Sequence, residues 1–191
     1  MSEKNPFPVT EVPQNAVEFL GNQSLLEVYA PLVPILIGSE VCWVIKRRIF
    51  GAILANIAGK IIGVALIVPF LFIHEILHAA VLGVPTELFM VKVGLALIPM
   101  EATPKTRYIV SALAPFALLG CLPLAVWVFL PSKYVTASTA LYFCAVCELV
   151  ACTADIANAI RATIEIPRGS FVLSSGSKVY WFVKDEGNET R

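Results

Sequence analysis

Charged residues are scarce in this sequence. Only 15% of its 191 residues are charged, the formal net charge at pH 7 is zero, and 58% of the residues are hydrophobic. A typical soluble domain carries about 25% charged residues, so this composition indicates an integral membrane protein, with the lipid bilayer as its first partner. Without a basic excess, nothing indicates a nucleic-acid partner. Residues 1–22 lack the basic and apolar regions of a signal peptide, so we expect no cleavable one.

Cysteines are also few, and their number is odd. The five cysteines all lie in apolar surroundings, at Cys42, Cys121, Cys144, Cys147 and Cys152. Such a set argues against a disulfide framework. The pair Cys144 and Cys147 matches the C-x-x-C pattern without a second pair, which favours small residues at a helix contact over a zinc or redox site.

Histidine is rarer still, and both histidines fall in one motif, His74-Glu75-Ile76-Leu77-His78. On a helix, residues four apart share a face, so His74 and His78 can bind one metal ion, while Glu75 can act on a water that the metal activates. This is the H-E-x-x-H motif of zinc hydrolases, and it follows an uncharged apolar run, residues 61–73. Because ionisable groups in hydrocarbon are costly without partners, metal binding is favoured over polar residues simply packed at a helix end.

Hydropathy predicts a mainly α-helical membrane protein with three or four transmembrane helices. Residues 49–83 are expected to be helical throughout, residues 108–132 form the clearest span, and residues 134–160 form the last one. Residues 25–45 are long enough to cross, but two prolines and Glu40 leave them either a span or an interfacial segment. This segment decides between three and four spans.

Two short β hairpins are predicted besides the helices. One lies within residues 86–105, directly after the motif helix, where an exposed edge could pair with an extended peptide. The other lies near the C-terminus, formed by residues 171–173 and 179–183. The expected organisation is a polar, loosely attached N-terminal tail (1–24), a membrane metalloprotease-like domain (25–166), and a C-terminal hairpin and tail (167–191).

A zinc enzyme needs a third protein ligand, with water at the fourth position. With no third histidine, the candidates are acids or thiols on the last predicted span, where Cys144, Glu148, Cys152 and Asp155 share one helical stripe. Asp155 is the first candidate, Glu148 the second and Cys152 the third, with Asn158 placed to orient a ligand or a substrate carbonyl. The alternative for Asp155 is a plain ion pair with Arg161.

Together these features resemble a known family. The motif span, the β-prone segment, a span that opens with Arg107-Tyr108 and contains Leu113-Ala114-Pro115, and the run Thr153-Ala-Asp-Ile-Ala-Asn158 resemble the putative zincin peptidases. These small membrane proteins are similar in layout to the site-2 intramembrane metalloproteases, and the resemblance covers about residues 61–183. In site-2 proteases the third ligand is an Asp on a later helix, which the resemblance places at Asp155.

The resemblance implies a Zn²⁺-dependent metalloendopeptidase, multi-pass in the cell membrane, that cleaves membrane-embedded polypeptides. His74, His78 and Asp155 would hold the zinc, and Glu75 would pass a proton from water to the leaving amine. The main alternative is a zinc-binding membrane scaffold or regulatory subunit that cleaves nothing, for which a closed site with Glu148 or Cys152 as a fourth ligand would argue. A third reading is a transporter subunit, which an internal repeat would favour; none is visible.

Overall fold

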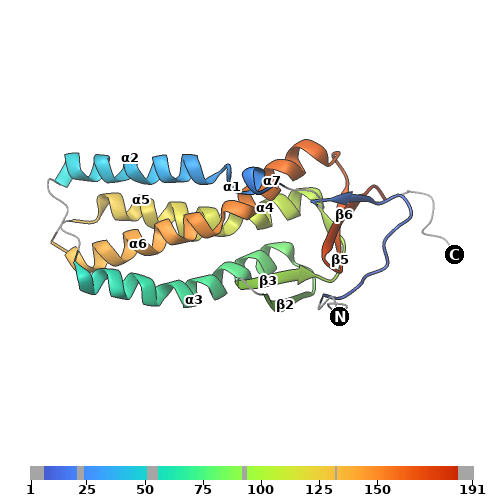
Figure 1. The fold of residues 1–191 in the computed structure, drawn as a ribbon, viewed down its shortest axis with the longest axis horizontal. Helices are drawn as coiled ribbons and strands as arrows, with labels where there is room; N and C mark the ends of the chain where they lie inside the picture. The colour runs from blue at the N-terminus through green and yellow to red at the C-terminus, as the bar shows by residue number, and fades with distance from the viewer. Residues whose placement is uncertain (1–6, 21–23, 51–55, 92–93, 132, 185–191) are drawn as a thin grey trace.

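A computed structural model describes residues 7–20, 24–50, 56–91, 94–131 and 133–184. Four helical passes run back and forth along the long axis of the molecule, and the β strands gather at one end (Figure 1). The predicted fold class, mainly helical with two small hairpins, is confirmed. Three helical stretches are long and apolar enough to cross a membrane, and a bent pair would make a fourth.

The first pass comprises α1 (Leu25–Tyr29) and α2 (Leu32–Phe50). Ser24 and Glu27 form a capping box at the start of α1, each side chain bonded to the other residue's backbone N–H. The whole stretch 25–50 qualifies by length and hydropathy as a span. It lies alongside the other passes in Figure 1, which favours the four-pass arrangement over an interfacial segment.

The second pass is the motif helix α3 (Ile57–Leu82). The prediction of unbroken helix over residues 49–83 is wrong at its start, because α2 ends at Phe50 and Asn56 is the N-cap of a new helix. The Asn56 side chain accepts a 2.6 Å hydrogen bond from Gly59 N–H, which satisfies a backbone donor that a helix start leaves free. The predicted end holds: Gly83 has φ 62°, the left-handed cap that glycine adopts without strain.

The third pass runs through α4 (Lys105–Pro115), a π-helical segment η1 (Phe116–Cys121) and α5 (Leu122–Phe129). Together they form the span predicted at residues 108–132. The π-helical turns lie between Pro115 and Pro123, both of which lack a backbone donor. A change in hydrogen-bond register is one way for a helix to absorb the carbonyls that prolines leave free.

The last pass is broken. The continuous helix predicted over residues 134–160 is instead α6 (Val135–Ala151) and α7 (Thr153–Glu165), bent by 43° at Cys152. The Thr153 hydroxyl donates to the Val150 carbonyl three residues earlier. Such side-chain bonds compete with the helical ladder and favour a bend.

Both predicted hairpins are present. Strands β2 (Thr86–Val91) and β3 (Gly94–Pro99) pair antiparallel beside the end of α3 (Figure 1). The second hairpin joins β5 (Phe171–Ser175) to β6 (Lys178–Phe182) through a turn in which Gly176 has φ 60°. Two short strands that the sequence does not signal, β1 (Val17–Phe19) and β4 (Thr103–Pro104), complete a sheet of order β1-β6-β5-β4.

The N-terminal segment is not loosely attached over residues 7–20. Strand β1 pairs with β6, and Ser175 Oγ hydrogen-bonds both the N–H and the carbonyl of Thr10, at 3.1 and 2.7 Å. Phe19 is 2% exposed and packs with Ala162, Ile166 and Val172. A three-residue strand is too short for an alternating pattern to reveal, so its pairing is a property of the tertiary structure.

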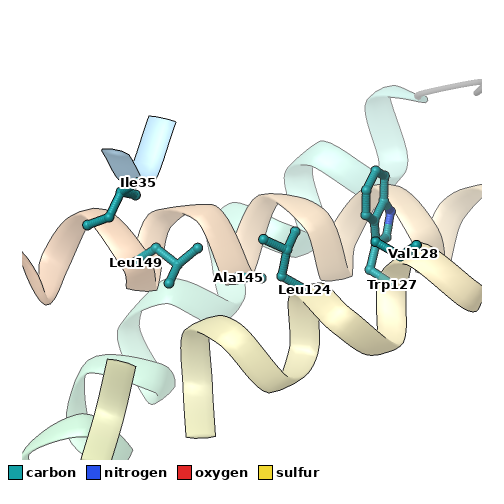
Figure 2. Packing of buried hydrophobic residues seen from close by; sticks show 6 residues of the cluster. All are labelled: Ile35, Leu124, Trp127, Val128, Ala145 and Leu149. Atoms are coloured by element: carbon teal, nitrogen blue, oxygen red, sulfur yellow. The ribbon is translucent and has the colours of Figure 1, made fainter. Parts of the chain in front are cut away.

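Packing ties the passes together. The main apolar cluster, drawn in Figure 2, joins α2, α5 and α6 through Ile35, Leu124, Trp127, Val128, Ala145 and Leu149. Two glycines set the approach of α3 to α6. A Cβ added at Gly59 would lie 2.6 Å from Thr139 Cβ, and one at Gly63 would lie 2.9 Å from Phe143 Cβ. Small residues at such contacts let helix backbones come close.

We therefore expect Gly59→Ala to destabilise the protein by about 1–3 kcal/mol, because the new methyl overlaps α6. Gly38→Ala is the matched control, since a Cβ there meets nothing within 4 Å and alanine has the higher helix propensity. Thermal unfolding in detergent should show a lowered midpoint for the first variant and an unchanged or raised one for the second. Equal midpoints would contradict the close α3–α6 contact.

Candidate metal centre

Three helices bring the predicted site residues together. His74, Glu75 and His78 lie in the last third of α3, while Glu148 is on α6 and Asp155 is on the first turn of α7. His74 is 6% exposed and Glu148 2%. The bend between α6 and α7 lies between these two acids, and both reach the same imidazole.

The two Nε2 atoms of the histidines meet Asp155. His74 Nε2 and His78 Nε2 are 3.0 Å apart, and Asp155 Oδ2 lies 3.2 Å from the first and 3.7 Å from the second. Two imidazole nitrogens and a carboxylate oxygen are a donor set that zinc takes in hydrolases. The structure therefore brings together the three residues named first from the sequence.

The opposite ring nitrogens have partners of their own. His74 Nδ1 lies 3.2 Å from Glu148 Oε2, and His78 Nδ1 lies 2.8 Å from the Ser111 carbonyl oxygen. A carbonyl or carboxylate accepts a proton held on Nδ1, and this leaves each Nε2 with a lone pair. Two such lone pairs and a carboxylate oxygen this close repel one another unless a cation lies among them. The residues present thus fit a metal ion.

A second group of possible ligands shares His74 but uses its other nitrogen. Cys152 Sγ lies 3.8 Å from His74 Nδ1, next to Glu148, and both residues are buried. Within the described part of the chain, no fourth His, Cys, Asp or Glu atom joins the group of His74, His78 and Asp155. Glu148 and Cys152, the second and third candidates for the third ligand, therefore lie on the Nδ1 side of His74.

A cleft of about 270 Å³ opens on one side of the centre. Glu75, His78, Asp155 and Asn158 line it, whereas His74 and Glu148 lie behind. Its other walls come from α4 and from strands of both sheets, through residues that include Leu97, Ile98, Tyr108, Ser111, Ser174 and Val179. The predicted general base and the third ligand thus face the same space as the predicted orienting residue.

Two expectations from the sequence differ from what the structure shows. The alternative ion pair of Asp155 with Arg161 is not formed, because Arg161 binds Glu165 through hydrogen bonds of 2.7 and 3.0 Å. The predicted polar stripe is split at the bend: Glu148 and Asp155 contact His74 from either side, while Cys144, 1% exposed, belongs to neither group of possible ligands.

Sequence reasoning missed Ser111 and Tyr108. Ser111 holds His78 twice, since its carbonyl meets Nδ1 and its hydroxyl donates to the His78 carbonyl at 3.0 Å. Any residue supplies a backbone carbonyl, so no signal in the sequence could have found the first contact. Tyr108 lines the cleft. In the sequence, Arg107-Tyr108 contributed to the family resemblance, but no role was predicted for Tyr108.

The chain is mainly helical, with three or four candidate membrane spans, and it carries a cluster of two histidines and an aspartate. It therefore falls in the class of helical proteins with candidate spans and a possible metal site. A model of the family described as "putative zincin peptidase" matches residues 66–170, more than half of the chain, and the protein belongs to this family. Membership indicates a zinc-dependent peptidase. The matched region contains the motif, Glu148 and Asp155. Neither the curated proteins nor the solved structures gave a significant match.

Elemental analysis of the detergent-purified protein should find about one zinc per chain, lost in His74→Ala and Asp155→Ala, because each substitution removes one of three ligands. Glu165→Ala, which removes an acid from the same helix as Asp155, should keep its zinc. Zinc lost only with His74→Ala would move the third ligand to Glu148 or Cys152.

Glu148 should act on zinc binding through His74. We expect Glu148→Leu to weaken zinc affinity about 10–100-fold, as loss of a residue that orients a ligand does, and Glu148→Gln, which keeps an acceptor oxygen, to weaken it less. Competition with a chelator measures this. Cys144→Ser, one turn earlier on α6, is the control and should bind as the wild type does. Complete zinc loss in both Glu148 variants would instead make Glu148 a ligand.

Proposed function

We propose that this protein is an intramembrane zinc metallopeptidase of the site-2-protease type, which cleaves membrane-embedded polypeptides in the cell membrane. One observation carries the proposal: the Nε2 atoms of His74 and His78 and a carboxylate oxygen of Asp155 converge beside a cleft that Glu75 also lines. The setting is a bundle of apolar helices long enough to cross a bilayer. A peptide and water can therefore meet at this cluster.

His74, His78 and Asp155 would hold the metal, and each residue around them has a separate task. When bound, zinc polarises the scissile carbonyl and lowers the pKa of water. Glu75 accepts the proton of the attacking water and delivers it to the leaving amine. Asn158 and Tyr108 line the same cleft, where an amide or phenol can donate a hydrogen bond to the negative charge that develops on the carbonyl oxygen.

The strand β3 offers a way to hold an extended substrate. Leu97 and Ile98 of β3 line the cleft, β2 pairs with one edge of β3, and no described strand pairs with the other edge. A peptide can add to such an edge through main-chain hydrogen bonds. A transmembrane helix satisfies its backbone internally, so the substrate must unwind locally before it can bind in this manner.

The competing reading is a zinc-binding scaffold or regulatory subunit without proteolysis. The buried group of His74, Glu148 and Cys152 is the observation in its favour, since a metal there would be closed to substrate. The peptidase is favoured because the group of His74, His78 and Asp155 borders the cleft and, within the described residues, has no fourth protein ligand. An open position is typical of catalytic zinc.

Glu75→Gln tests the proposal. The variant should keep its zinc and lose cleavage by about 10²–10⁴-fold, because the amide cannot take up the proton. The assay incubates protein and a library of transmembrane peptides in lipid nanodiscs and detects new termini by mass spectrometry. Glu87→Gln, an exposed residue on β2 outside the cleft, is the control. Zinc-loaded wild-type protein that cleaves nothing would favour the scaffold, and cleavage by Glu75→Gln at the wild-type rate would remove Glu75 from the mechanism.

A further inference from the structure

A second cavity, of about 200 Å³, lies at the opposite end of the bundle from the sheets. It is framed by Trp43 of α2, Lys60 of α3 and Trp127 of α5, and its floor comes from α6, through residues that include Ser138 and Phe143. In Figure 1 this is the end where α2 finishes and α3 begins, with α6 between them. The cavity therefore lies between all four passes, at one end of the candidate spans.

This end of the bundle is rich in cations and poor in acids. The sequence has no Asp or Glu between Glu40 and Glu75, nor between Glu101 and Glu148. Five cations are nevertheless found at this end, at Lys46, Arg47, Arg48, Lys60 and Lys133. Lys60 is exposed, and its side chain makes no hydrogen bond or ion pair with any described residue. Its ammonium thus has no partner among the residues that the structure describes, and Lys60 forms part of the cavity wall.

A second ammonium lies behind the floor. Lys46 is 1% exposed, its Nζ donates to the Trp127 carbonyl at 2.6 Å and to Ser138 Oγ at 2.9 Å, and it lies 4.3 Å from the centre of the Trp127 ring. No carboxylate of the described chain neutralises it. Trp127 and Ser138, which line the cavity, are thus in direct contact with a buried positive charge.

Trp127, one of the residues that line the cavity, carries an unsatisfied donor. Trp127 is fully buried, and its indole Nε1–H has no acceptor within the described structure. Buried donors are normally paired, so the missing partner calls for an explanation.

We propose that this cavity binds the phosphate group of an anionic phospholipid. The phosphate supplies acceptor oxygens for the Lys60 ammonium and a negative charge that balances Lys60 and Lys46, and basic pockets between transmembrane helices bind such headgroups. Trp43 and Trp127 are of the residue type that is enriched at the membrane interface. Phe143 adds an apolar wall against which the acyl chain of the lipid can pack. A zwitterionic headgroup is disfavoured because its ammonium would meet two lysines.

Native mass spectrometry of the purified full chain in mixed micelles tests this binding. Phosphatidylglycerol should bind more tightly than phosphatidylcholine, and Lys60→Gln should weaken phosphatidylglycerol binding about fivefold, the value of one lysine near anionic lipid. Lys133→Gln is the matched control, because it removes a charge from the same end but not from the cavity. Its affinity should stay within about twofold of the wild type.

Three outcomes would overturn the proposal. Equal affinity for the two lipids would show that the headgroup charge does not contribute to binding. Equal loss in Lys60→Gln and Lys133→Gln would show general attraction to a basic surface. Displacement of phosphatidylglycerol by millimolar inorganic phosphate alone would make free phosphate the ligand. None of these measurements depends on zinc or proteolysis.

Discussion

The arrangement of the centre depends on one buried imidazole. His74 contacts Asp155 through Nε2 and Glu148 through Nδ1, so a single side chain of α3 is held by both halves of the last pass. In an apolar bundle, each of these polar groups would be costly without its partner. Gly59 and Gly63 allow the approach of α3 to α6 that makes the contact possible. The close packing of α3 on α6 is thus also what assembles the site.

The bend at Cys152 gives the two acids different tasks. Residues seven apart on a straight helix are separated by about 10.5 Å along its axis. Glu148 and Asp155 have this spacing, yet both lie 3.2 Å from nitrogens of the same ring, on either side of a 43° bend. One acid is left buried behind the imidazole, and the other lines the cleft. A carboxylate that orients a ligand and one that can bind the metal are thereby distinguished by position.

The two ends of the bundle differ in chemistry. The end with the sheets holds the histidines, the acids and a cleft partly walled by strands, whereas the other end holds five cations and an aromatic cavity. Helix α3 connects them, since Lys60 and His74 are separated by about 21 Å of helix. A lipid bound at one end and a peptide bound at the other would therefore not compete for space.

The sequence by itself determined the apolar helices, both hairpins, the shared face of His74 and His78, and the acids able to join them, because hydropathy, turn residues and i, i+4 spacing are local properties. The tertiary structure decided the break at Cys152, the pairing of β1 with β6, the Ser111 carbonyl behind His78, and which side of His74 each acid occupies. These features join segments from 33 to more than 150 residues apart, or depend on a bend that such packing holds. No local pattern encodes which of two acids on one stripe will face the cleft.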